Sequence, residues 1–253
     1  MKRFLLLIFL ITTCSLLLSS CKGSDNQWEA PGVTLTVDAA GKPREVSTGI
    51  QLMVILSVLT LAPTIIIMAT SFTRIVVVLS LLKNALGAPS VPPAQVLTGL
   101  ALLLTFFVMA PIYNKINEQA IKPYMDGKVE EEEAFNSAMK PLREFMFSQT
   151  REKDIALFLD LNKQPKPKTL EDIPTIVLLP AFVINELRIA FTMGFVIYVP
   201  FLVIDIVISS LLLAMGMMML PPTVVSLPFK LLLFVMVDGW FLITRSLALS
   251  FYN

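Results

Sequence analysis

The sequence IVLLPAFVINELRIAFTMGFVIYVPFLVIDIVISSLLLAMGMMML, residues 176–220, decides the class of fold to which this chain belongs. It is apolar along nearly its whole length, and only a few prolines and charged residues punctuate it. A single helix of this length would reach about 67 Å, roughly twice the hydrocarbon core of a bilayer. We therefore expect the run to fold back, to break at Pro200, or to stand partly outside the lipid.

Further apolar segments lie on both sides of this run, at residues 50–69, 75–82, 96–112 and 224–251. Pro63 predicts a kink in the first of them. Of all residues, 55% are hydrophobic and 15% are charged, whereas soluble domains carry about 25% charged residues. The sequence predicts an all-α, polytopic membrane protein built from long, kinked helical hairpins.

The composition also excludes several functions. The chain contains no histidine, and its two cysteines, Cys14 and Cys21, lie near the N-terminus. This removes the usual general base, the common nucleophile pairs and most transition-metal sites. No phosphate-binding loop is present, and a net charge of +1 creates no field that would attract nucleic acid. We expect no catalytic residue, no enzymatic activity, no metal, no cofactor and no nucleic-acid partner.

The first residues have the pattern of an export signal. Two basic residues precede a short apolar run, residues 4–11, which is too short to span a bilayer well. The segment ends in Leu18-Ser19-Ser20-Cys21, which resembles the site where lipoprotein signals are cleaved. Cys21 is therefore a candidate for lipidation, and ordinary cleavage just before it is the alternative. Residues 22–49 are rich in turn-forming residues and predict a periplasmic linker.

The distribution of charge predicts the topology. Residues 113–173 carry ten lysines and arginines against twelve aspartates and glutamates, whereas the loop at 70–95 carries Arg74 and Lys83 and no acid. The positive-inside rule places this loop in the cytoplasm and residues 113–173 in the periplasm. The expected organisation is a signal peptide at 1–21, a linker at 22–49, a first hydrophobic helical hairpin at 50–112, a helical periplasmic region at 113–173 and a C-terminal hydrophobic helical hairpin with a Met-rich loop at 174–253.

Five charged residues interrupt the apolar segments: Glu186, Arg188, Asp205, Lys230 and Asp238. Each would cost about 2.5–3.5 kcal/mol in a lone helix facing lipid. Glu186 and Arg188 lie about 200° apart around a helix, so they cannot pair with each other. We expect all five to make polar contacts between helices or between subunits. A purely structural role and a proton relay both remain open, although the lack of histidine weakens the relay.

A cluster of methionines, Met215-Gly216-Met217-Met218-Met219, precedes two prolines. Methionine side chains are long and unbranched, and they repack around irregular shapes. A loop of this kind could close a pore without specifying what passes through it. The alternative is the end of a helix that uses methionine as filler in lipid.

Four long blocks resemble a known family, the FliP/SctR family of type III secretion export-gate subunits. They are TSFTRIVVVLSLLKNALGAPSVPPAQVLTGLALLLTFF at 70–107, PLREFMFSQTREKDIALF at 141–158, LPAFVINELRIAFTMGF at 179–195 and VPFLVIDIVISSLLLAMGMMMLPPTVVSLPFKLLLFVMVDGW at 199–240. The resemblance runs in order from about residue 50 to residue 253. Blocks of this length are far more specific than a short motif.

The resemblance implies a channel-forming subunit of the flagellar export gate, in the inner membrane at the flagellar basal body and partly facing the periplasm. Family members assemble as homo-oligomers, pentamers where characterised, with FliQ and FliR. Together they form a helical, cone-like channel through which unfolded flagellar subunits cross the inner membrane. The other proteins of the export apparatus are further expected partners. The resemblance also implies inter-subunit contacts for Arg151, Glu186 and Lys230, and a pore gasket for the methionine cluster. Phe145 and Phe158 are candidates for subunit packing, with core packing as the alternative.

Three other functions remain open at this point. The equivalent gate of a virulence injectisome is close in sequence. An ion-coupled transporter would use Glu186 as its carboxylate. An intramembrane aspartyl protease would use Asp205 and Asp238, since a carboxylate pair can activate water.

Overall fold

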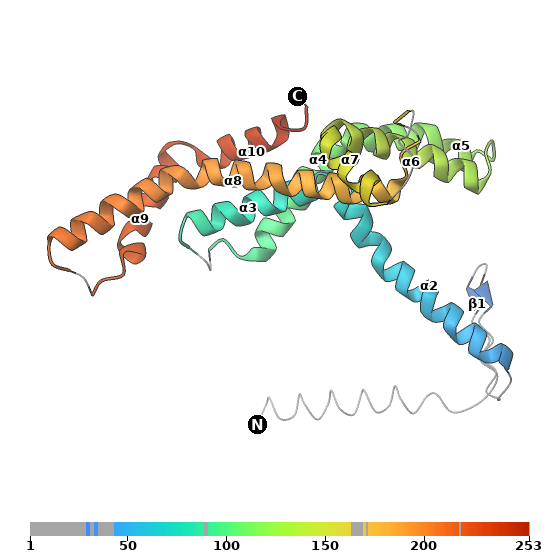
Figure 1. Cartoon of the computed structure of the whole chain (residues 1–253), viewed down its shortest axis with the longest axis horizontal. Helices are drawn as coiled ribbons and strands as arrows, with labels where there is room; N and C mark the ends of the chain where they lie inside the picture. The colour runs from blue at the N-terminus through green and yellow to red at the C-terminus, as the bar shows by residue number, and fades with distance from the viewer. Residues whose placement is uncertain are drawn as a thin grey trace, which may run out of the picture. The chain divides into compact units, whose positions relative to one another are not determined.

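The computed structural model describes residues 29–30, 33–34, 43–88, 91–162, 169–170, 172–217 and 219–252. This part of the chain is almost entirely helical (Figure 1), which confirms the all-α prediction. Its only strands are the two-residue β1 (Glu29–Ala30) and β2 (Val33–Thr34), which pair antiparallel. The helices are α2 (Pro43–Met68), α3 (Phe72–Ala85), α4 (Ala94–Ile116), the π-helical turn η1 (Asn117–Ile121), α5 (Lys122–Met125), α6 (Glu131–Gln149), α7 (Glu152–Leu161), α8 (Thr175–Ala214), α9 (Pro222–Met236) and α10 (Gly239–Leu249).

Several of these helices can cross a membrane by length and composition. Within the described residues, the stretches Ala94–Met125 and Thr175–Ala214 each suffice alone. Two bent pairs, α2 with α3 and α9 with α10, raise the number to four if each pair counts as one span. The protein is therefore a polytopic helical membrane protein, as the composition predicts.

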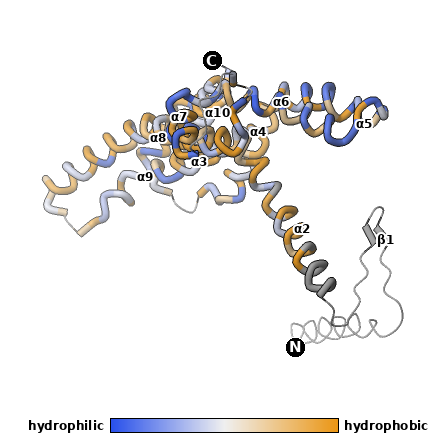
Figure 2. Tube along the Cα trace, turned by 45° about the vertical axis from the view of Figure 1, so that its right-hand side comes forward, coloured by the Kyte–Doolittle hydropathy of each residue, from blue (hydrophilic) through white to orange (hydrophobic). Residues whose placement is uncertain are grey.

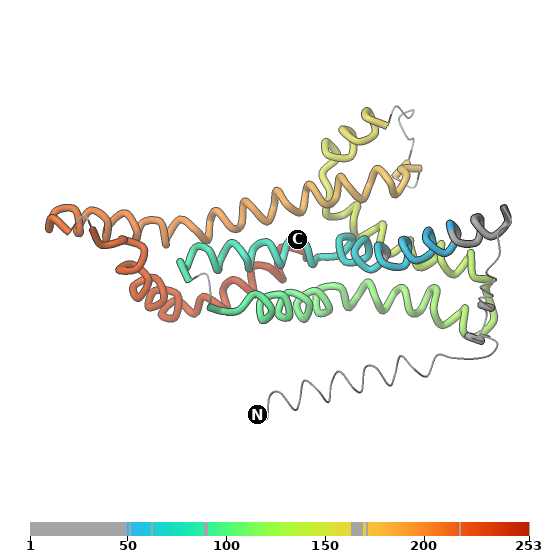
Figure 3. The backbone as a smooth tube through the Cα atoms, turned by 90° about the horizontal axis from the view of Figure 1, so that it is seen from below, coloured from blue at the N-terminus to red at the C-terminus, as the bar shows by residue number. Residues whose placement is uncertain are grey.

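Helix α8 is continuous over 40 residues and contains both Pro180 and Pro200. Figure 3 shows it as one unbroken tube. Of the three alternatives expected for this run, it neither folds back nor breaks at Pro200, because a proline removes only one backbone hydrogen bond and apolar helices that pack against neighbours tolerate this loss. At 1.5 Å per residue α8 is about 60 Å long, so it must tilt or extend beyond a hydrocarbon core of about 30 Å.

One compact unit, residues 59–253, holds every helix from α3 onward. In it, α3 lies between α8 and α4, and α6 and α7 pack beside the first part of α8 (Figures 1 and 3). Helix α9 packs against the later part of α8. The core lies where these helices meet, and its fully buried side chains include Ile75, Val78, Leu82, Ala101, Leu178 and Phe182.

Small residues allow α8 and α3 to approach each other closely. Ala190 is fully buried, and a Cβ atom added to Gly194 would lie only 2.2 Å from Leu81 Cδ1. Both residues share one face of α8, since they are four apart. Their spacing is thus a packing feature of the α3–α8 contact.

Polar residues gather on α5 and α6, whereas α2 and α8 are mostly apolar (Figure 2). The chain remains helical from α4 through η1 into α5, so the expected boundary at residues 112–113 falls inside a helix that continues through Pro111. Helix α6 begins with Glu131, Glu132 and Glu133, where acidic side chains favour the positive end of the helix dipole.

Candidate functional site

A buried ion pair joins α3 to α8. Arg74 and Glu186 are 1% and 0% exposed, and Arg74 Nε donates a hydrogen bond of 2.9 Å to Glu186 Oε2. Arg74 Nη2 donates a second hydrogen bond to Glu186 Oε1. The two parallel bonds make this a bidentate guanidinium–carboxylate pair, the strongest geometry available to such groups.

The remaining donors of Arg74 reach two other parts of the chain. Nη1 donates to both the carbonyl and the hydroxyl oxygen of Ser250 at 2.9 Å, and Nη2 donates to Gln149 Oε1 at 3.1 Å. The guanidinium carbon also lies 3.8 Å from the centroid of the Phe251 ring, a cation–π distance. All five N–H groups of Arg74 are therefore satisfied.

Neighbouring amides extend this network. Asn185 Nδ2 donates to the backbone carbonyl of Gln149, and Gln149 Nε2 donates to the carbonyl of Phe251 at 3.4 Å. Arg188 Nη2 donates to Asn185 Oδ1 at 3.2 Å. The polar network thus holds together α3, the end of α6, the first half of α8 and the residues that follow α10.

A second polar cluster joins α8, α9 and the end of α3. Lys230 is 3% exposed, and its Nζ lies 2.6 Å from Asp205 Oδ2 and 3.3 Å from the carbonyl oxygen of Ala85. Ser226 donates to the other carboxylate oxygen of Asp205 at 2.6 Å. Both oxygens of Asp205 are therefore occupied by partners from α9.

The methionine cluster forms the turn between α8 and α9. Gly216 has a φ of +75°, and the amides of Gly216 and Met217 bond back to the carbonyls of Leu213 and Leu212 at 3.0 Å. This is a Schellman helix end, which needs a residue in the left-handed conformation. Met215, Met217 and Met219 are 71%, 40% and 98% exposed, and Met218 lies outside the described residues. The turn therefore presents long, flexible, apolar side chains away from the core.

The other predicted residues are distributed over the unit. Arg151 pairs with Asp154 at 2.9 Å at the start of α7, within one helical turn. Asp238 stands at the junction of α9 and α10 rather than within a helix. Phe145 packs inside the chain, with ring centroids 5.9 Å from Phe182 and 6.3 Å from Phe251. Phe158 packs partly buried against the same core, and Cys21 lies outside the described residues.

Glu186 and Lys230 both make contacts between helices of the same chain, which is one of the two contacts expected for them. Both pair with another helix of the same chain and are almost inaccessible at its surface. Contact between subunits for these two residues stays a prediction.

Sequence reasoning missed Arg74. The distribution of charge predicts a cytoplasmic loop at 70–95, but α3 occupies residues 72–85 and buries Arg74. One signal was available: Arg74 directly precedes the apolar run 75–82, so its charge needed a partner as much as Glu186 did. The buried pair also removes Arg74 from the charges that the positive-inside rule can count.

The arrangement favours structural roles for its carboxylates. Glu186 is enclosed by Arg74, and Asp205 is held by an ammonium group and a hydroxyl group. In the described part of the chain, no interaction joins Asp205 to Asp238, and no three acidic, histidine or cysteine side chains could hold a metal ion. An aspartyl protease requires two carboxylates that share a proton, and this geometry does not provide them.

The comparisons with known proteins agree with one another. The model of the FliP family matches residues 55–247. The chain is 51% identical over 217 residues to the flagellar biosynthetic protein FliP of Bacillus subtilis, covering 86% of this chain and 98% of that protein. It is 53% identical over 204 residues to the protein of the same name from Pectobacterium carotovorum, covering 81% of this chain and 79% of that protein.

Proposed function

This chain belongs to the FliP family, and from that premise we propose that it forms part of the channel of the flagellar protein-export gate. In this proposal it passes unfolded flagellar subunits across the inner membrane and catalyses no reaction itself. The relatives named above carry flagellar names, which favours the flagellar gate over the injectisome gate.

The observation that carries the proposal is the methionine turn between two apolar helices. Its described methionines are exposed, while the helices that present it are fixed by the Lys230–Asp205 pair. The turn lies ten residues beyond Asp205, or about 15 Å along the helix axis. An apolar turn whose methionine side chains can repack suits a seal that must open for chains of varied sequence and then close again.

The exposed surface of helices α8 and α9 supports assembly of several chains into a larger tube. Val196, Val235 and Met236 are 65%, 75% and 75% exposed on α8 and α9. Apolar patches of this extent mark contacts with lipid or with other proteins. We propose that copies of this chain, five as in the family, cover part of this surface together with FliQ and FliR, and that α5 to α7 face the periplasm.

The mechanism is passive gating. Methionine side chains from several copies meet at the constriction and exclude water and ions, because their contact surface is apolar. An extended substrate displaces them one rotamer at a time. After the substrate leaves, the side chains repack, and the seal does not require a specific substrate sequence.

Replacing Met215, Met217, Met218 and Met219 with alanine tests the seal. We expect the gate complex to assemble in normal amount and the cells to leak small ions, measured as the rate of dye or potassium flux. The matched control replaces Met53 and Met125, which are 72% and 79% exposed elsewhere in the chain. Unchanged permeability in a fully assembled variant would contradict the proposal.

A further inference from the structure

The residues that follow α10 are fastened to the core by polar and aromatic contacts. Arg74 Nη1 donates to both the carbonyl and the hydroxyl oxygen of Ser250 at 2.9 Å. The guanidinium carbon of Arg74 lies 3.8 Å from the centroid of the Phe251 ring, and Gln149 Nε2 donates to the Phe251 carbonyl at 3.4 Å. We call residues 250–251 the strap.

Arg74 is not fully satisfied without the strap. Its guanidinium carries five N–H donors, of which Glu186 takes one from Nε and one from Nη2, and Gln149 takes the other from Nη2. Within the described part of the chain, both donors of Nη1 go to Ser250. Arg74 is 1% exposed, so loss of the strap would either leave two buried donors unpaired or open the site to water.

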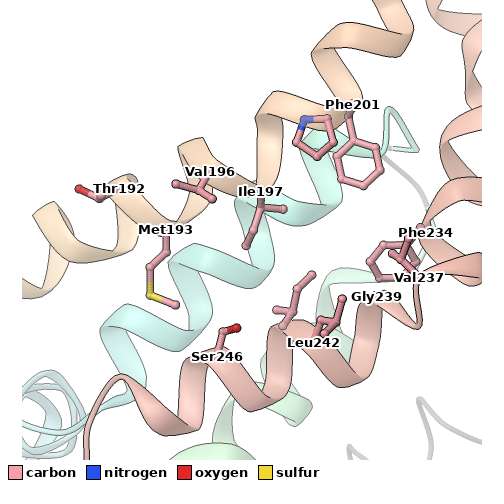
Figure 4. Close-up of a pocket in the computed structure, with 12 residues that line it drawn as sticks. Thr192, Met193, Val196, Ile197, Phe201, Phe234, Val237, Gly239, Leu242 and Ser246 are labelled. Atoms are coloured by element: carbon pink, nitrogen blue, oxygen red, sulfur yellow. The ribbon is translucent and has the colours of Figure 1, made fainter. Parts of the chain in front are cut away.

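The middle of α10 is held less closely than its end. An apolar groove of about 370 Å³ separates α8 from α10, and its lining includes Met193 and Ile197 on α8 and Leu242 on α10 (Figure 4). In the last turn of α10, by contrast, Leu247 is 1% exposed and belongs to the core. Helix α10 is therefore attached to the bundle mainly near the point where the strap begins.

The strap continues the backbone of α10 without a break. The amides of Ser250 and Phe251 donate to the carbonyls of Ser246 and Ala248 at 3.0 and 3.2 Å. Phe251 is 8% exposed, and the centroid of its ring lies 6.3 Å from that of Phe145 on α6. Because the backbone bonds join the strap to the last turn of the helix, release of the strap would also release the end of α10.

We propose that the strap closes over Arg74 as the last step in packing the bundle, once α9 and α10 are in place, and that α10 and the strap open and close as one unit. Ser250 lies 176 positions after Arg74, so the Arg74 site is not completed before the chain has been synthesised to that point. Segments held by few buried side chains open more readily than the core, and α10 is such a segment. The proposal does not depend on channel formation.

The test measures amide hydrogen exchange by mass spectrometry in the full-length chain, purified in mild detergent with the subunits that co-purify. The variant Ser250→Ala/Phe251→Leu removes the hydroxyl group and the ring that contact Arg74 and keeps an apolar side chain. We expect exchange in residues 239–252 to become at least about tenfold faster. Exchange in α3 and α9 should change less than about twofold, because the ion pairs of these two helices remain.

Two control variants keep the contacts of the strap. Leu249→Ala/Tyr252→Ala changes its two exposed neighbours, and Ser250→Thr/Phe251→Tyr preserves the hydroxyl group and the ring, so α10 should exchange within about twofold of the unchanged chain in both. Unchanged exchange of α10 in Ser250→Ala/Phe251→Leu, or an equal increase throughout residues 59–253, would overturn the proposal. Where that double variant is not recovered, Phe251→Leu alone is measured by the same criteria.

Discussion

Arg74 makes more contacts with distant parts of the chain than any other charged side chain described here. Its guanidinium binds Glu186 on α8, Ser250 after α10 and Gln149 at the end of α6. Removing one partner of a buried pair leaves an uncompensated charge, which costs about 3–5 kcal/mol. Much of the stability of this region therefore rests on a single residue.

We expect Arg74→Met and Glu186→Gln each to lower the stability of the purified chain by about 3–5 kcal/mol, measured as the midpoint of thermal unfolding in detergent. The double variant should be less destabilised than the sum of the two single variants, because it leaves no unpaired charge. Strictly additive effects would contradict the pair as the source of stability.

Two glycines within helices offer a matched comparison. A Cβ at Gly194 would lie 3.1 Å from Leu81 Cβ as well as 2.2 Å from its Cδ1, whereas a Cβ at Gly99 would meet nothing within 4 Å. We expect Gly194→Ala to cost about 1–3 kcal/mol by overpacking. Gly99→Ala should be neutral or stabilising by up to about 1 kcal/mol, since alanine favours helix. Chemical denaturation of both variants measures this difference, and equal effects would exclude a close α3–α8 contact.

At the scale of elements, the junction of α9 and α10 is a sharp corner. The two helices bend by 63°, and Asp238 at the corner has a φ of +52°. A Cβ on the following Gly239 would lie 2.3 Å from the ring of Phe234. The corner therefore requires a left-handed residue followed by one without a side chain.

Glycine adopts the left-handed conformation without the penalty that other residues pay, which is about 1 kcal/mol. We expect Asp238→Gly to stabilise the chain by up to about that amount and Asp238→Val to destabilise it by at least as much. Thermal unfolding of both variants checks the sign. A loss of stability in Asp238→Gly would show that the aspartate side chain makes a contact worth more than its backbone strain.

The sequence predicts which segments are helical better than it predicts where a helix ends or which helices contact each other. Apolar runs of helical length predict the helices, because burial in lipid or protein selects for them. The continuation of α8 through Pro200 could not be predicted, since it depends on neighbouring helices that tolerate a missing hydrogen bond. The contact between Arg74 and Glu186 joins residues 112 positions apart, and no pattern within one helix encodes it.

The pairing of Lys230 with Asp205 shows the same limit. The sequence indicates that both charges need partners, yet it does not choose between another helix and another chain. Only the packing of α9 against α8 brings them together. The methionine turn is different, because its composition alone predicts a flexible apolar loop, and the exposed side chains of Met215, Met217 and Met219 agree with that.

At the scale of the whole molecule, much of the apolar surface of the described helices is uncovered. Phe195, Phe106 and Leu103 are 70%, 60% and 69% exposed. Burying such side chains is worth about 1.5–3 kcal/mol each, so this surface favours contact with lipid or with another protein.

We expect the full-length chain, purified in mild detergent from cells that express the export apparatus, to elute as an oligomer with co-purifying subunits. Mass spectrometry of the peak gives their identity and ratio. The control is the same purification from cells that lack the other gate subunits, where the oligomer should be smaller or less stable. A monodisperse monomer in both preparations would contradict assembly.

The continuity of α8 has a mechanical consequence. Glu186 fastens the helix near its beginning, and Ala214 at its far end lies 28 residues away, or about 42 Å along the axis. A rotation of α8 by one degree about Glu186 would displace Ala214 by about 0.7 Å. A rotation of only a few degrees in the bundle around Arg74 would therefore displace the methionine turn by about the width of an atom.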